Sequence, residues 1–150
     1  MAFNELFYHF VFVTKSRQHT IPPLYDGVLH AYMGGVMKNL KCQPLKINGT
    51  DNHVHILIKA PTDLSPIDFA RDVKRASSIW MKSHQEKFPH FNSWSREYAV
   101  FSVSKDNVES VSRYISNQKE HHRLKSFEDE YYDFLTDETK KVFVWKYFDT

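Results

Sequence analysis

The chain has 150 residues, a single cysteine and a formal net charge of +2. These values exclude a disulfide framework and a cysteine-ligated zinc site, and they leave any basic surface to local clustering of charge. The 41% hydrophobic and 15% aromatic content is typical of one globular domain. No apolar run approaches the roughly twenty residues that span a bilayer, and the N-terminus lacks the features of a secretory signal, so we expect a cytoplasmic protein with no membrane partner.

The first half of the chain predicts a strand, a helix and a hairpin. Residues 6–13, LFYHFVFV, are almost continuously apolar and rich in aromatic and β-branched types, which predicts a central strand covered on both faces. After a proline pair, apolar residues over 29–40 recur with helical spacing. Residues 43–50 predict a second strand, Asn48–Gly49 predicts a turn, and 53–60, HVHILIKA, predict the hairpin partner.

The second half predicts two helices around a fourth strand. A serine–proline pair at 65–66 predicts the start of a helix that ends near Phe88. Residues 98–104, YAVFSVS, predict the strand. An aspartate or asparagine at 106–107 can cap a third helix, which is expected to end near His122.

The order is therefore βαββαβ followed by a helix. This is the order of the ferredoxin-like α+β fold, which has a four-stranded antiparallel sheet with helices on one face. We expect one domain over 1–150, in which residues 126–150 form a C-terminal extension that is first acidic and then apolar. Many functions use this fold, so the function must be sought in the side chains.

Two histidines at the head of the third strand are the first candidate site. His53 and His55 are two residues apart, so they project from the same face of a strand, about 6.5 to 7 Å apart. Their ring nitrogens can converge on one metal ion, although a third ligand must then come from elsewhere. The alternative is that one histidine is exposed and the other bonds a backbone carbonyl, because so short a motif also arises by chance.

The third helix, SRYISNQKEHH over 112–122, offers that further ligand. Tyr114 and Gln118 are i, i+4 and share a helix face, and His121 lies one turn further along. Two imidazoles and one amide oxygen leave positions open for phosphate oxygens, which suits Mg²⁺ or Mn²⁺. Tyr114 would then be placed to attack a phosphorus atom. The alternative for Tyr114 is packing in the apolar stripe of the helix.

These motifs together resemble a known family. H-V-H-I-L followed by Y-I-x-x-Q-x-x-H resembles the HUH single-tyrosine transposases of the insertion-sequence 200/605 type, including the REP-associated tyrosine transposases. V-F-V-T-K, D-V-K-R-A-S-S and W-x-x-x-Y-A-V-F-S-V-S agree in the same order, and the resemblance covers about residues 7–122. One departure is Glu97, which stands before Tyr98 where relatives often have glycine, so the loop expected there is open to question.

The resemblance implies both the roles of the residues and the reaction. His53, His55 and Gln118 are implied to bind the Mg²⁺ or Mn²⁺, Tyr114 to be the nucleophile, and Asn117 and His121 to lie near the site. The implied enzyme is a DNA transposase that cleaves and rejoins hairpin-bearing single-stranded DNA through a 5′-phosphotyrosine intermediate. It is implied to act at the prokaryotic nucleoid as a homodimer, in which the tyrosine helix can serve either subunit.

Basic side chains that could hold the DNA occur near three predicted elements. For any single residue a solvated charged face is the alternative, so the clustering matters more than its members. The candidates are Lys74, Arg75, Lys82, Arg71, Lys15, Arg17 and Arg113.

Three other functions remain open from the sequence. A non-catalytic, ferredoxin-like nucleic-acid-binding domain is the principal alternative, although HVHILIK lacks the exposed aromatics of an RNA-recognition strand. A two-histidine phosphoesterase would need a second H-x-[ST] motif, which the chain lacks. The third alternative is a structural dimer in which the histidine motif is coincidental.

Overall fold

The computed structural model describes residues 3–120 and 126–134, and in them it has the expected α+β order. Four antiparallel strands form one sheet with the order β2-β3-β1-β4, which is the ferredoxin-like order. The strands are β1 (Leu6–Thr14), β2 (Gln43–Gly49), β3 (His53–Ala60) and β4 (Trp94–Val103). The helices are α1 (Asp26–Asn39), α2 (Pro66–Lys82), α3 (Val108–Ser116) and α5 (Phe127–Phe134), and the two 3₁₀ turns are η1 (Lys15–Arg17) and η2 (Lys105–Asn107).

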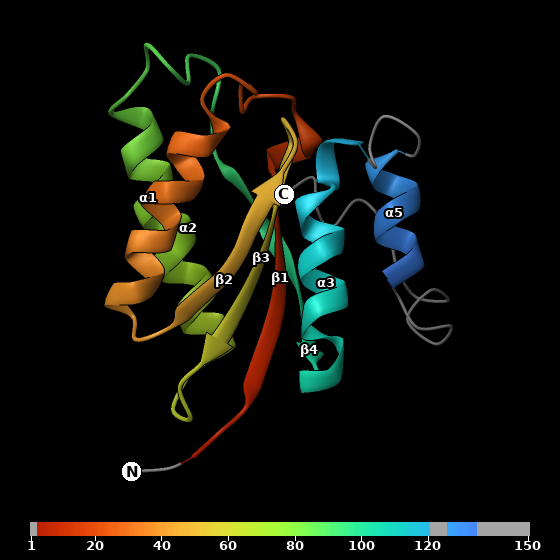
Figure 1. Cartoon of the computed structure of the whole chain (residues 1–150). Helices are drawn as coiled ribbons and strands as arrows, with labels where there is room; N and C mark the ends of the chain where they lie inside the picture. Colours follow the sequence, from red (N-terminus) through yellow and green to blue (C-terminus); the bar gives the residue numbers. More distant parts are fainter. Residues whose placement is uncertain (1–2, 121–125, 135–150) are drawn as a thin grey trace.

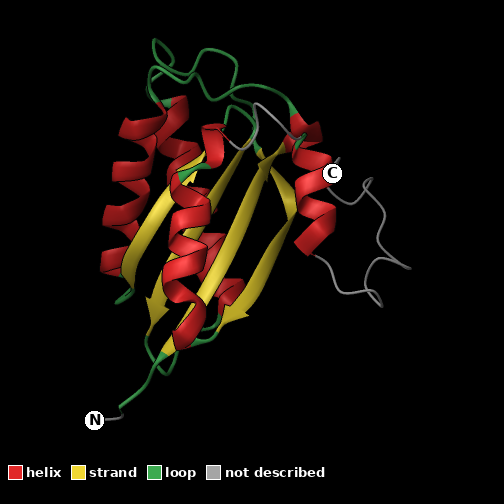
Figure 2. Ribbon diagram, turned by 45° about the vertical axis from the view of Figure 1, so that its right-hand side comes forward, coloured by secondary structure: helices red, strands yellow, loops and turns green. Residues whose placement is uncertain are grey.

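Helices cover both faces of this sheet. Figure 1 shows α1 and α2 on one side of the strands and α3 and α5 on the other. Figure 2, turned by 45°, shows the sheet between the same two groups. The expectation of helices on one face therefore holds for α1 and α2, whereas the helix that follows the last strand crosses to the opposite face.

The alternation of side chains along β1 and β3 explains the two layers. Phe10 and Phe12 on β1 and Ile56 on β3 point into the core under α1 and α2, where the Phe69 ring packs against Phe10 in a tilted arrangement, with ring centroids 4.5 Å apart. Fully burying such a side chain contributes roughly 1.5–3 kcal/mol. The alternate residues of β1 and β3 are buried under α3 and α5 as well, so β1 is a central strand covered on both faces, as predicted.

Helix α2 begins as predicted but ends earlier. Ser65 is its N-cap and accepts a hydrogen bond from the Asp68 amide at 3.4 Å, and Pro66 takes the first helical position. The expected end near Phe88 is wrong, because the helix stops at Lys82 and the Ser83 amide bonds back to its last turn. Phe88 is buried all the same, in a loop that packs on α2.

The predicted turn at Asn48–Gly49 is also wrong. Both residues belong to β2 and pair with His55 and Val54 of β3, and the chain reverses over residues 50–52. The glycine that suggested a turn has another cause. Gly49 packs closely on the backbone of His53, and a side chain at position 49 would collide with the His53 carbonyl. The glycine is needed for close approach between strands rather than for a turn.

Strand β4 starts at Trp94, four residues before the predicted start at Tyr98. Glu97 consequently lies within a strand, and there is no loop at the position where relatives often have glycine.

Across the described parts of the chain, every helix is too short or too polar to cross a membrane.

The third predicted helix is interrupted. Helix α3 ends at Ser116 with Asn117 as its C-cap, and helical conformation resumes over residues 118–120. The expected continuous helix to His122 is therefore wrong at residue 117, and His121 itself lies outside the described residues.

Candidate active site

The two histidines of β3 lie side by side on the face that α3 and α5 cover. Residues 53 and 55 alternate outward from the main core, so both imidazoles project toward the same side, with ring centroids 5.1 Å apart. Both are almost fully buried, with 0% and 1% of their surface exposed. Buried imidazoles need polar partners, and the surrounding elements supply them.

Gln118 and Tyr114 reach this histidine pair from the α3 side. The Gln118 side-chain oxygen Oε1 lies 3.1 Å from His53 Nε2, and Gln118 is fully buried. The Tyr114 ring meets His55 edge-on, with centroids 5.8 Å apart and planes at 81°. The interruption at Asn117 therefore does not separate the two residues from the site. Asn117 is exposed beside the buried Gln118.

Contacts with side chains of β2 and α1 fix the end of α3. The Asn48 amide Nδ2 donates to the carbonyls of Ile115 and Ser116, at 3.0 and 3.2 Å. Lys119 then bonds Asn48 Oδ1 at 3.0 Å and forms an ion pair with Asp26 Oδ2 at 2.9 Å. These contacts hold the residues on either side of Gln118, so its side chain is directed into the site.

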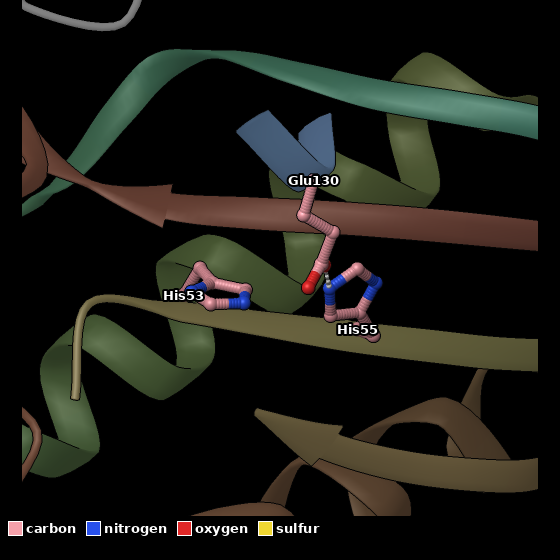
Figure 3. Close-up of side chains that lie close together, drawn as sticks. All are labelled: His53, His55 and Glu130. Carbon is pink, nitrogen blue, oxygen red and sulfur yellow. Dashed lines mark hydrogen bonds and ion pairs between the residues drawn. The ribbon is translucent and has the colours of Figure 1, made fainter. Parts of the chain in front are cut away.

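Two further residues belong to the site and were not singled out in the sequence. His9 on β1 places Nε2 2.8 Å from His55 Nδ1. Glu130 on α5 places Oε1 2.9 Å from His55 Nε2 and 3.3 Å from Gln118 Nε2. Figure 3 shows the Glu130 carboxylate reaching down to His55, with His53 beside it on the same strand.

The other side of His53 is held by the turn that precedes it. Asn52 Oδ1 lies 2.7 Å from His53 Nδ1, and Thr50 Oγ1 lies 3.0 Å from the same nitrogen. Asn52 Nδ2 donates to the Arg17 carbonyl at 3.4 Å, which orients the Asn52 oxygen toward His53. The proton of a neutral His53 is thus held on Nδ1, and Nε2 presents its lone pair to the site.

In the described orientation of these groups, acceptor atoms face one another. With the described orientation of Gln118, its oxygen faces the lone pair of a neutral His53. With the amide reversed, the oxygen would face the Glu130 carboxylate instead. A divalent cation, or a second proton on an imidazole, removes this conflict between acceptors. The ligand atoms of His53, His55 and Glu130 lie within 4.8 Å of one another, so the residues present fit a bound cation.

Burial and charge also set the protonation of two neighbours. Burial, followed by a hydrogen bond to Glu130 and the negative charge of Glu130, raises the pKa of Tyr114 well above its usual range, while a hydrogen bond from Gln118 opposes this. Burial and the adjacent His55 lower the pKa of His9 to about 3 against the opposing charge of Glu130. At neutral pH the phenol is therefore protonated and the His9 imidazole is neutral.

The basic candidates are divided between the two faces. Those on α2 lie on the side of the sheet opposite α3 and α5 (Figure 1). Arg71 is held by Asp68 and Asp72, and the Lys74 ammonium donates to the Arg96 carbonyl over the Tyr98 ring. Arg75 and Lys82 are exposed on the same helix.

The remaining basic candidates lie nearer to the site. Lys15 and Arg17 form η1 directly after β1, whose Val13 pairs with His53. Arg17 lines a polar cavity of about 300 Å³ that also borders Asn52 and Ser126. Arg113 lies on the exposed side of α3, paired with Glu109 at 2.9 Å.

Trp94 and Tyr98 both pack against other side chains of the fold. Trp94 is buried and donates its indole N–H to Ser77 at 3.0 Å, and Tyr98 packs against Phe10 and Phe12. Trp94 is therefore a structural residue of the interior, whose indole N–H is already bonded.

A ferredoxin-like sheet with a buried set of metal-type ligands next to a helix-borne tyrosine defines a candidate phosphoryl-transfer enzyme. The family described as "Transposase IS200 like" matches residues 2–118. The chain belongs to this family, and it is accordingly a transposase, an enzyme that cleaves DNA.

Individual relatives agree with this membership. The ISDra2 transposase TnpA of Deinococcus radiodurans is 25% identical over 119 residues, which span 76% of this chain and 84% of the relative. The crystal structure of a putative transposase from Deinococcus radiodurans R1 is 26% identical, has a TM-score of 0.63, and is matched over 78% of this chain and 93% of its own. A REP-associated tyrosine transposase bound to a REP hairpin shares the fold, with a TM-score of 0.60, 11% identity, and coverage of 81% and 72%.

Proposed function

We propose that this transposase cleaves and rejoins hairpin-bearing single-stranded DNA through Tyr114, with a divalent cation held by His53, His55 and Gln118. The observation that carries the proposal is the convergence of these four side chains within a single chain, where both histidines and Gln118 are buried. The hairpin substrate is supported by the REP hairpin in the fold relative.

The chain's own residues would arrange the chemistry. The Tyr114 oxygen forms a bond to a backbone phosphorus, and the bond from that phosphorus to the 3′-oxygen breaks. In net terms the phenolic proton passes to the leaving 3′-oxygen, giving a 5′-phosphotyrosine and a free 3′-hydroxyl. Because no water takes part, the energy of the phosphodiester is retained, and another 3′-hydroxyl can reverse the step to rejoin strands. A bound Mg²⁺ or Mn²⁺ would supply positive charge against a phosphate oxygen.

Phosphate contacts near this site would come from Lys15, Arg17 and Arg113. The ion pairs of Arg17 with Glu128, at 3.8 Å, and of Arg113 with Glu109 involve partly exposed side chains. Such pairs contribute little, so both arginines can exchange their carboxylate for phosphate oxygens. The basic residues of α2 lie on the other face of the sheet. There they would contact either DNA that passes over that face or the partner subunit of a homodimer.

A covalent adduct assay tests the proposal. The full chain is incubated with Mn²⁺ and a library of 3′-labelled single-stranded hairpins with randomised flanks, and a denaturing gel is run. We expect a labelled protein band, because the tyrosine stays joined to the 5′ end of the 3′ fragment. Tyr114→Phe should abolish the band. Tyr132→Phe should leave it unchanged, because Tyr132 is an exposed tyrosine of α5.

Two results would contradict the proposal. A band that persists in Tyr114→Phe would assign the nucleophile to another residue. DNA binding without any adduct in the wild-type chain would favour the non-catalytic nucleic-acid-binding domain.

A further inference from the structure

We propose that Glu130 is a fourth protein ligand of the same cation, so that the site takes a carboxylate from outside the region that matches the family. The family match ends at residue 118, and Glu130 lies on α5, beyond it. This inference rests on the proposed function, because it concerns the cation that His53, His55 and Gln118 would hold.

The first support is the position of the carboxylate. Its Oε1 atom lies 2.9 Å from one histidine ligand and 3.3 Å from the Gln118 amide, and the ligand atoms of His53, His55 and Glu130 are all within 4.8 Å of one another. Two oxygen or nitrogen ligands of one Mg²⁺ or Mn²⁺ lie roughly 3–4 Å apart, since each is about 2.1 Å from the ion. Small rotations of the side chains would therefore bring all three onto one ion.

The second support is the way in which the chain delivers this residue. Ser126 begins α5 by accepting a hydrogen bond from the Asp129 amide at 3.2 Å, and its carbonyl accepts from the Glu130 amide at 3.0 Å. Glu130 thus stands on the first turn of the helix, with 2% of its side chain exposed. On the same helix Glu128 forms an ion pair with Arg17 of η1. Helix α5 is docked so that one carboxylate enters the site and another stays at the surface.

The third support is chemical. Two imidazoles and an amide oxygen form a neutral ligand set, which holds a hard divalent cation weakly. Mg²⁺ and Mn²⁺ prefer carboxylate oxygens, and one buried carboxylate would offset half of the ionic charge. The unfavourable transfer of that carboxylate from water would be offset by the cation.

The same contacts also fit the opposite role, in which Glu130 is a lock: a carboxylate that bonds His55 and Gln118 and thereby keeps a cation out of the site. The two roles predict opposite effects of removing the charge. A ligand strengthens cation binding, so its loss weakens binding. A lock competes with the cation, so its loss strengthens binding.

Titration of the full-length chain with Mn²⁺, followed by the electron paramagnetic resonance signal of the free ion, distinguishes them. The variants are Glu130→Gln, His55→Ala and, as the matched control, Glu128→Gln on the same helix. We expect Glu130→Gln to raise the Kd for Mn²⁺ at least tenfold, since even residues that only support a ligand affect affinity 10- to 100-fold. Glu128→Gln should leave the Kd within about twofold of wild type.

The outcomes separate this inference from the proposed function. A wild-type or tighter Kd in Glu130→Gln, together with lost binding in His55→Ala, overturns the inference and leaves the proposed cation site standing. Unchanged binding in His55→Ala overturns both. If circular dichroism shows that Glu130→Gln does not fold, Glu130→Asp replaces it, and a wild-type Kd in Glu130→Asp then counts against the inference, because the shorter side chain withdraws the carboxylate.

Discussion

His9 is the residue that completes the environment of His55. It lies on the neighbouring strand, its ring centroid is 5.1 Å from that of His55, and their nitrogens are 2.8 Å apart. Because its pKa is lowered to about 3, His9 stays neutral as the pH falls through the usual histidine range, and it can accept the Nδ1–H of His55 throughout. A neutral His55 with its proton on Nδ1 has its lone pair on Nε2, the atom that would bind a cation.

Replacing His9 with phenylalanine should weaken Mn²⁺ binding. An aromatic ring still fills the position, while the acceptor that orients His55 is lost, and we expect the Kd to rise roughly 10- to 100-fold. The same titration of free Mn²⁺ measures it. His90→Phe makes the same change at an exposed position between α2 and β4 and should not alter the Kd. A wild-type Kd for His9→Phe would mean that His9 only fills space.

At the residue scale, the sequence predicts those candidate site residues that lie close to one another along the chain. His53 and His55 are two residues apart and Tyr114 and Gln118 four apart, so strand and helix periodicity place each pair on one face. His9 and Glu130 meet His55 only through sheet pairing and the docking of α5. Sequence spacing carries no signal for such contacts. An isolated histidine within the apolar strand LFYHFVFV was the only available hint.

The β2–β3 hairpin is the element on which the position of His53 depends. Gly49, at the end of β2, packs against the backbone of His53, and the Thr50 amide bonds the His53 carbonyl at 3.1 Å. There is no room for a Cβ atom at position 49, because its nearest neighbours are backbone atoms of His53 and Val54, which cannot rotate away.

Gly49→Ala should therefore destabilise the protein and displace His53. We expect the free energy of unfolding to fall by roughly 1–3 kcal/mol, as overpacking usually does, and the Kd for Mn²⁺ to rise. Urea denaturation and the Mn²⁺ titration measure the two effects. Gly35→Ala is the matched control, because Gly35 is exposed in α1 with open space around it and should gain up to about 1 kcal/mol from helix propensity. Equal stability of the two variants would contradict the packing argument.

Most helices and strands could be predicted from the sequence, and the errors in their predicted bounds have tertiary causes. No glycine or proline interrupts residues 108–122, so local sequence predicts an unbroken helix. In a continuous helix the carbonyls of Ile115 and Ser116 would accept from residues 119 and 120. The Asn48 side chain donates to both carbonyls at the interruption, and that contact from a distant strand is absent from any local pattern.

At the scale of the whole molecule, the sheet separates the histidine cluster from the four basic candidates on α2. The cluster lies under α3 and α5, whereas the basic residues of α2 lie on the opposite layer (Figures 1 and 2). The charges of Arg71 and Lys74 are already engaged within their own chain. Basic residues that are scattered in the sequence thus form two surfaces rather than one.

Within a single chain, Tyr114 lies against the histidines of that same chain. Its ring contacts His55 directly, and the contacts of Asn48 fix the end of α3 against the sheet that carries the histidines. In a homodimer, each site would then be complete within one subunit.

Mixed dimers test that arrangement. A Tyr114→Phe chain, which keeps its histidines, is co-expressed with a His55→Ala chain of different length, which keeps its tyrosine. If each tyrosine serves its own histidines, every site in the mixed dimer is defective, and we expect no covalent DNA adduct on either chain. If the tyrosine served the other subunit, one site would be intact and the adduct would form on the His55→Ala chain. Co-expression of wild type with His55→Ala is the control, and it should give an adduct on the wild-type chain alone.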